Sequence, residues 1–340
     1  MKISLHRLVY LLLLGVVIFT LVWAGSKNID RHKTSLKQPL GDCRVVQHVM
    51  GETCIPRNPQ RIVTLWMSTF SSALALGIKP IGYIWIPGEP FPNYLRDKVD
   101  GVEFLGSLNE PNLEKILLLK PDLILSNTRL QNIYKPLTYI APTVVLDYPG
   151  PPPPWQKHLE DVAKVLDKEQ ESKQLIGEYW QRIDKLKQAL GVGVASPKEN
   201  RRKQIQVSVV SINSSYGMFI YGKKHPVGGV LNDIELQRPP GQSGDFFVKN
   251  NISQERLFDI DGDVIFLSAL GGEAAKEALE KMQKEPLWQK LKAVQKNQVH
   301  LVDSAHWYAF DVLAMNAVID DLFKYLTGSI PKTMSVSNPL

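Results

Sequence analysis

The chain has 340 residues, of which 44% are hydrophobic and 22% are charged, and these proportions are typical of a globular protein. They exclude fibrous and disordered chains. The formal net charge is +6, but lysine and arginine alternate with acidic residues, as between Glu171 and Lys187, and form no basic stripe. A nucleic-acid partner is therefore not expected, although a weakly cationic surface is compatible with an anionic small ligand.

The N-terminus has the pattern of a secretory signal peptide, which we predict over residues 1–24. Lys2 and Arg7 precede a mostly apolar run, and Val22 and Ala24 occupy the small-residue positions of a cleavage site. The apolar run is slightly shorter than the roughly 20 residues that span a bilayer. The alternative to cleavage is retention as an N-terminal membrane anchor. Both interpretations place the rest of the chain outside the cytoplasm, in the periplasm.

Cys43 and Cys54 are the two cysteines of the chain. In an exported protein, two cysteines this close in sequence predict a disulfide, with two free thiols as the alternative. Cys43 follows Leu40-Gly41-Asp42 and lies far from the apolar run, which argues against a lipid anchor. A zinc site is disfavoured because two thiols without a histidine pair leave a tetrahedral site incomplete.

Residues 25–41 are polar and predict a flexible leader, after which short strands alternate with helices. The predicted elements are a β-hairpin over 44–55, strands over 61–66, 81–85, 123–126 and 143–146, and helices over 67–77 and 113–119. Such alternation is typical of a mainly parallel sheet. The prolines at 149 and 151–154 cannot continue a sheet or a helix. They end a predicted N-terminal lobe over 42–154.

Residues 155–190 contain no proline, and their apolar residues recur at spacings of three and four, which predicts a helix. A helix of this length would measure about 50 Å, so we expect it to bridge two lobes. A break near Lys168 to Ser172 is the alternative.

A second alternating set predicts a C-terminal lobe over 191–327, followed by a tail over 328–340. Its predicted elements are strands over 205–212, 264–267 and 299–302 and helices over 227–234, 252–257, 274–282 and 312–326. The predicted fold class is α/β. It consists of two lobes, each with a mainly parallel sheet flanked by helices, joined by one long helix.

Several segments resemble the periplasmic iron-siderophore-binding proteins of ABC importers, the ferric dicitrate-type family. The resemblance extends over about residues 43–327 and is carried by residues 49–63, 110–125, 252–266 and 287–301. It implies a helical-backbone binding protein that captures a ferric siderophore or iron chelate in the cleft between its lobes and delivers it to an ABC importer permease. It also implies a monomer without a separate cofactor, because the iron is carried within the bound siderophore.

The resemblance further implies that Glu114 and Glu255, each at the start of an equivalent helix in one lobe, project outward to meet arginines of the permease. Exposed carboxylates suit this role because they make charge-assisted, orienting contacts across an interface. The alternative is an acid that favours a helix N-terminus through the helix dipole.

Aromatic and cationic side chains follow strand ends in both lobes, where ligands of parallel α/β sheets bind. An iron chelate is bulky, oxygen-rich and often anionic, which suits flat apolar walls and guanidinium donors. The candidate ligand-binding residues are Trp66, Tyr83, Trp85, Arg129, Tyr216, Tyr221, Arg238, Trp307 and Tyr308. Each aromatic residue could instead pack in a core or between the lobes.

Other functional classes lack their motifs. The seven histidines show no pairing at metal-ligand spacing, so no protein-bound metal is predicted. The sequence contains neither a G-x-S-x-G motif nor a P-loop, and no enzymatic activity is expected. The alternatives among binding proteins are carriage of cobalamin or haem, and an anchored ligand sensor.

Overall fold

The computed structural model of the chain describes residues 43–85, 91–192, 205–215 and 217–328. The predicted signal peptide (1–24), the leader (25–41), Tyr216 and the tail beyond Gly328 lie outside these described residues. The chain divides into compact units over 1–43 and 44–340. No helix within the described ranges has the length and apolar character needed to cross a membrane.

A two-stranded sheet opens the described chain. It consists of β1 (Cys43–His48) and β2 (Gly51–Pro56), which confirms the predicted hairpin. Gly51, at the turn, has a φ of 118°, a conformation that favours glycine. Cys43 and Cys54 are disulfide-bonded, as the sequence predicts.

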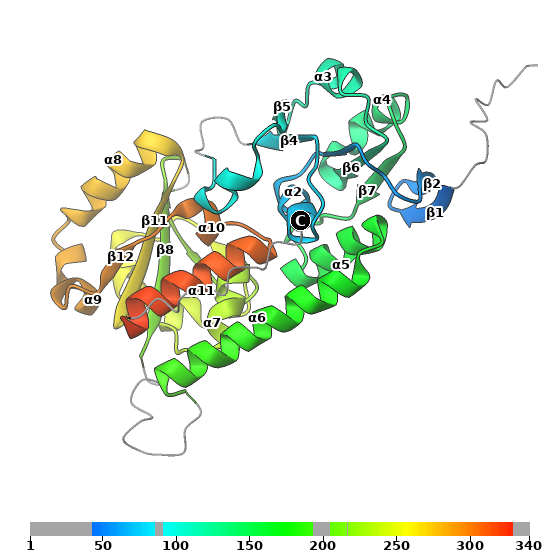
Figure 1. Ribbon diagram of the computed structural model, residues 1–340. Helices are drawn as coiled ribbons and strands as arrows, with labels where there is room; N and C mark the ends of the chain where they lie inside the picture. Colours follow the sequence, from blue (N-terminus) through cyan, green and yellow to red (C-terminus); the bar gives the residue numbers. More distant parts are fainter. Residues whose placement is uncertain (1–42, 86–90, 193–204, 216, 329–340) are drawn as a thin grey trace, which may run out of the picture. The chain divides into compact units, whose positions relative to one another are not determined.

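The N-terminal lobe contains a five-stranded sheet of order β5-β4-β3-β6-β7, in which every pairing is parallel (Figure 1). Its central strand is Ile-Val-Thr, and all three side chains are buried, as the β-branched run predicts. The strands are β3 (Ile62–Thr64), β4 (Gly82–Trp85), β5 (Glu103–Ser107), β6 (Leu123–Asn127) and β7 (Thr143–Leu146). The connecting helices are α2 (Met67–Ala75), η2 (Asn93–Lys98), α3 (Leu113–Leu118), η3 (Thr128–Ile133) and α4 (Tyr134–Thr138).

The C-terminal lobe contains a second five-stranded sheet, of order β10-β9-β8-β11-β12. Strands β8, β11 and β12 are parallel, which confirms the mainly parallel prediction, but β9 and β10 add an antiparallel edge that the sequence analysis missed. The strands are β8 (Val207–Asn213), β9 (Gly217–Tyr221), β10 (Val248–Lys249), β11 (Val264–Leu270) and β12 (Val299–Leu301). The helices are α7 (Pro226–Asp233), η5 (Pro240–Gln242), η6 (Gln254–Ile260), α8 (Gly272–Gln283), η7 (Trp288–Lys290), α9 (Lys292–Gln295), α10 (Ser304–Trp307) and α11 (Val312–Thr327).

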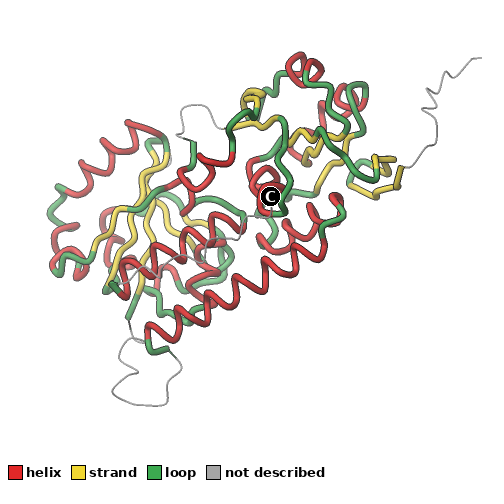
Figure 2. Tube along the Cα trace, in the orientation of Figure 1, coloured by secondary structure: helices red, strands yellow, loops and turns green. Residues whose placement is uncertain are grey.

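The bridge between the lobes is two helices, α5 (Trp155–Leu166) and α6 (Glu169–Leu190), seen as successive coils in Figure 2. The break falls at Asp167, whose left-handed φ of 58° ends α5 just before the stretch proposed from the sequence. Helix α5 packs on α2 and helix α6 on α11. The Tyr179 hydroxyl of α6 donates to Asp233 of α7 (2.6 Å), so the bridge is held to the C-terminal lobe by a partly buried hydrogen bond.

Two neighbouring glycines of α7 test how closely that helix packs against Gly222, the residue after β9. A Cβ on Gly228 would lie well inside van der Waals contact with the Gly222 carbonyl oxygen, whereas a Cβ on Gly229 would meet nothing. We expect Gly228→Ala to lower the free energy of unfolding by about 2 kcal/mol or more. Gly229→Ala should raise it by about 0.5–1 kcal/mol, because alanine favours the helix. Urea unfolding of both variants measures this, and equal effects would contradict the packing.

Candidate functional site

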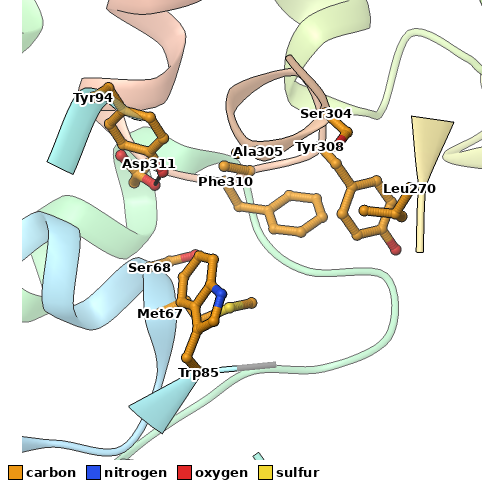
Figure 3. A pocket seen from close by; sticks show the side chains of 11 residues that line it. Met67, Ser68, Trp85, Tyr94, Leu270, Ser304, Ala305, Tyr308, Phe310 and Asp311 are labelled. Carbon is orange, nitrogen blue, oxygen red and sulfur yellow. Dashed lines mark hydrogen bonds between the residues drawn. The ribbon is translucent and has the colours of Figure 1, made fainter. Parts of the chain in front are cut away.

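An opening lies between the start of α2, Trp85 at the end of β4 and Tyr94 of η2 on one side and the segment that joins α10 to α11 on the other (Figure 3). The residues that give it its chemical character are Met67, Trp85, Tyr94, Tyr308, Phe310 and Asp311. The opening therefore receives side chains from both lobes at the ends of their strands, where ligands of α/β sheets bind.

The walls of the opening are mostly aromatic. Trp85 and Met67 of the N-terminal lobe lie opposite Phe310 and Tyr308 of the C-terminal lobe (Figure 3). Each wall is backed by a further ring, because Phe91 lies 5.3 Å from Trp85 between ring centroids and Phe247 lies 5.8 Å from Phe310. Such walls can hold a flat or bulky apolar ligand surface at little cost in side-chain entropy.

A cation lies next to this aromatic wall. The Arg129 guanidinium is 5.6 Å from the Trp66 ring and 6.0 Å from the Tyr148 ring. Burial raises the pKa of Tyr148 to about 12, and Arg129 and Tyr308 both act on it electrostatically, so the three groups share one neighbourhood. Within the described residues the Arg129 side chain has no ion pair, and it is exposed. An exposed guanidinium beside aromatic rings can donate its N–H groups to an anionic ligand.

A carboxylate lines the opening beside Tyr94 (Figure 3). Asp311 precedes α11, and its Oδ1 accepts the Ala314 N–H at 3.0 Å as a helix N-cap. Its Oδ2 accepts the Tyr94 hydroxyl at 3.1 Å, a hydrogen bond that joins the two lobes. Burial raises the pKa of Asp311 to about 6, against the lowering effect of its hydrogen-bond donors. The charge at this end of the opening therefore changes between pH 5 and 7.

Asp311 makes stability depend on pH in a predictable direction. In the folded protein the Asp311 carboxyl group keeps its proton up to about pH 6, whereas in the unfolded chain it loses the proton near pH 4. The contribution of Asp311 to stability is thus greatest at pH 4 and is lost as pH rises to about 6. The variant Asp311→Asn keeps the N-cap but has no carboxyl group to titrate. We expect its free energy of unfolding, relative to that of the wild type, to increase by about 3 kcal/mol between pH 4 and 7. Urea unfolding at both pH values measures this; a difference independent of pH would contradict it.

The structure places some of the predicted ligand-binding residues at this site and others in the core. Trp85 and Tyr308 line the opening, and Trp66 and Arg129 lie beside it. Tyr216 lies outside the described residues. Tyr83 is partly exposed and does not line the opening; its ring contacts other rings of its own lobe, with centroids 5.1–5.9 Å away, and these are Phe70, Phe91 and Phe104.

Trp307 is a core residue, contrary to our expectation of a ligand wall. It is 0% exposed, its ring lies 4.7 Å from Phe266, and its Nε1 donates to Asp321 at 2.8 Å. No surface of this side chain faces the opening. We therefore infer that Trp307 supports its neighbour Tyr308 from within the core.

Tyr221 and Arg238 are buried as well. Tyr221 belongs to β9 rather than to a loop, and its ring stacks on His225 with 3.8 Å between centroids. Arg238 donates through Nη2 to the Tyr221 carbonyl at 2.6 Å and to Gln242 at 2.7 Å. Both residues hold β9 and the following loop in place behind Tyr308, so we infer a structural role for them.

Among the lining residues that were missed from the sequence, four give the opening much of its chemical character: Met67, Tyr94, Phe310 and Asp311. Asp311 carried a usable signal, because an aspartate directly before a predicted helix is an N-cap candidate. The other three are apolar or aromatic residues in loops or short helices, and only the pairing of the lobes brings them together.

Glu114 and Glu255 lie in equivalent short helices away from the opening. Each is the second residue of its helix, α3 or η6, and each is exposed. The helices precede β6 and β11, which occupy the same position in the order of their sheets. The predicted equivalence of the two helices is thus present in the fold. In the described part of the chain, no group of three or more metal-ligating side chains is close enough to hold a metal ion.

Comparison with known proteins gives consistent matches. A family described as "Periplasmic binding protein" matches residues 86–305. The probable siderophore-binding lipoprotein YfiY of Bacillus subtilis (strain 168) is 32% identical, over 94% of this chain and 97% of that protein. The Fe(3+)-citrate-binding protein YfmC of the same strain is 31% identical, over 85% and 88%. The crystal structure of Staphylococcus aureus SirA complexed with staphyloferrin B is 27% identical, with a TM-score of 0.67, over 83% and 98% of the two chains.

Proposed function

We propose, from the premise that this chain belongs to the periplasmic binding protein family, that it captures a ferric siderophore or other iron chelate and delivers it to an ABC importer. The family and the relatives are substrate-binding transport proteins, so the chain is a binding protein and not an enzyme. The iron is carried within the chelate, and the protein supplies no separate cofactor.

The observation that carries this proposal is the opening between the lobes, with aromatic walls and an adjacent unpaired guanidinium. An iron chelate presents an apolar or aromatic body and oxygen atoms that often bear negative charge. Trp85, Tyr308 and Phe310 can contact the body, and Arg129 can donate to the oxygens. We propose these four residues, with Trp66 behind Arg129, as the ligand-binding set.

Delivery requires a second surface, and we propose Glu114 and Glu255 for contact with the permease. They lie one on each lobe, so a partner that touches both can sense how the lobes are arranged. The opening itself stays free for ligand because neither glutamate lines it. The protein acts as a monomer in this scheme, since one chain supplies both contacts.

The remaining parts of the proposal concern export and lobe boundaries. We propose export to the periplasm by the segment over 1–24, either cleaved or kept as an anchor. We also propose lobes over 42–154 and 191–327, joined by 155–190. The packing of α5 on α2 and of α6 on α11 supports this division.

A thermal unfolding series tests the function. Ligand that binds the folded state alone stabilises it by about 2.7 kcal/mol at a concentration of one hundred times Kd. Among ferric citrate, ferric hydroxamates, ferric catecholates, cobalamin and haemin, we expect at least one ferric chelate to raise Tm. Its iron-free form should raise Tm less. If only cobalamin or haemin raises Tm, that compound replaces the ferric chelate as the proposed ligand. If none of these compounds raises Tm, the proposed function is contradicted.

A further inference from the structure

The two short helices that carry Glu114 and Glu255 share more than their acidic residue. In both, the glutamate is followed by a basic residue, then by a fully buried aliphatic residue, then by an exposed large apolar residue. The corresponding residues are Lys115 and Arg256, Ile116 and Leu257, and Leu117 and Phe258. The same order of charges, burial and exposure therefore occurs once in each lobe.

The framework around these helices is repeated too. Asp122 and Asp263 each lie eight residues after the glutamate of their lobe. The Asp122 carboxylate accepts the backbone N–H groups of Gln60 and Arg61 at 2.7 and 2.9 Å, just before β3. Asp263 accepts the backbone N–H of Gln206 at 3.0 Å, just before β8. In both lobes, the segment that follows the helix is thus fixed to the start of the central strand of the sheet in the same way.

The charges of the repeat leave the two glutamates available. Lys115 is paired with Glu103 at 2.8 Å, and Arg256 is paired with Asp259 at 2.8 Å. The basic neighbour of each glutamate is therefore engaged by a different acid. In the described chain Glu114 and Glu255 make no ion pair, so a cationic group of a partner is their complement.

The apolar members of the repeat are exposed to nearly the same extent. Leu117 is 55% exposed and Phe258 is 56% exposed, three residues after the glutamates. On a helix, residues three apart lie on the same side. An exposed large apolar side chain is common by itself, but here each lobe presents one next to an unpaired carboxylate. An apolar side chain beside a carboxylate that can meet a cation suits a protein interface, in which an apolar core is surrounded by polar groups.

We propose that Leu117 and Phe258 are the apolar anchors of the permease-docking surface, each entering an apolar depression beside the cation that binds the adjacent glutamate. This inference rests on the proposed delivery to an importer and specifies the chemistry of the partner. The permease must offer two such depressions with cations, one for each lobe. The glutamates orient the complex, and the apolar side chains hold it together.

The test uses cells that lack the chromosomal copy and express the full chain. Import of radiolabelled iron is measured, supplied as ferric citrate or as a ferric hydroxamate or catecholate siderophore, whichever the purified protein binds. The variant Leu117→Ala/Phe258→Ala should reduce import at least about tenfold. Its Tm and its Kd for the chelate should match those of the wild type, because both side chains are exposed and lie away from the opening.

The control is Tyr139→Ala/Leu301→Ala, which removes exposed large apolar side chains from the same two lobes, 77% and 62% exposed, and should import normally. Import by the anchor variant equal to that of this control would overturn the inference. The variant Glu114→Ala/Glu255→Ala is measured in parallel. If it is impaired while the anchor variant is not, only the anchors are wrong. If both import normally, the proposed docking surface itself fails.

Discussion

Replacing Glu114 and Glu255 together by alanine is expected to reduce iron import at least about tenfold while leaving ligand affinity unchanged. Loss of one partner from a buried charge pair at an interface costs about 2–5 kcal/mol, because the other charge is left unpaired. Both glutamates are exposed and neither lines the opening, so the purified variant should bind the chelate like the wild type. Import by the complemented cells and Kd by titration give the two readouts.

The matched control for this variant is Glu160→Ala/Glu277→Ala. It also removes two negative charges, but from exposed positions of α5 and α8, outside the two helices that carry Glu114 and Glu255. We expect its import to equal that of the wild type. A glutamate variant that imports like this control would refute the docking assignment. A glutamate variant that loses ligand affinity would show that the two carboxylates act on the opening instead.

Replacing Arg129 by alanine is expected to weaken binding of an anionic ferric chelate by about 10–100-fold. A hydrogen bond to a charged group contributes about 1.5–3 kcal/mol, which corresponds to that range in Kd. Arg129 is held over Trp66 and Tyr148, so its N–H edge is positioned before the ligand arrives. Arg129→Lys should recover little of the loss, because an ammonium group lacks the planar fork.

Lys135→Ala provides the comparison for Arg129. Lys135 is an exposed cation of α4 in the same lobe, so its loss changes the net charge equally without touching the opening. Affinity should fall only slightly in this variant, through long-range electrostatics. If the Arg129 and Lys135 variants have the same Kd, the guanidinium makes no direct contact and only the overall charge matters.

The fold was largely predictable because its strands and helices have strong local patterns. The β-branched run before Trp66 indicates a strand, and the apolar periodicity of 155–190 indicates a helix; neither pattern fits another type of element. The break at Asp167 was harder to place, because no proline or glycine marks it and the left-handed residue is an aspartate. Strand β9 was missed because its aromatic residues, Phe219 and Tyr221, were interpreted as part of a loop at the end of β8.

The site was less predictable because aromatic residues have the same local signature in a core and in a ligand wall. Trp307 and Tyr308 are adjacent in sequence, yet one is enclosed by Phe266 and Asp321 and the other lines the opening. That distinction depends on how α10 sits between β11 and α11, which is a tertiary property. Glu114, by contrast, is exposed at the start of α3, as the resemblance implies.

We expect the opening between the lobes to bind an intact ferric chelate. The most direct measurement is a titration of tryptophan fluorescence in the wild type and in Trp85→Phe, with ferric citrate, ferric hydroxamates and ferric catecholates, their iron-free forms, cobalamin and haemin. We predict saturable quenching by one ferric chelate, little effect of its iron-free form, and a smaller quench in Trp85→Phe because Trp85 lines the site. Saturation by cobalamin or haemin alone, or identical quenching in the two proteins, would contradict the account.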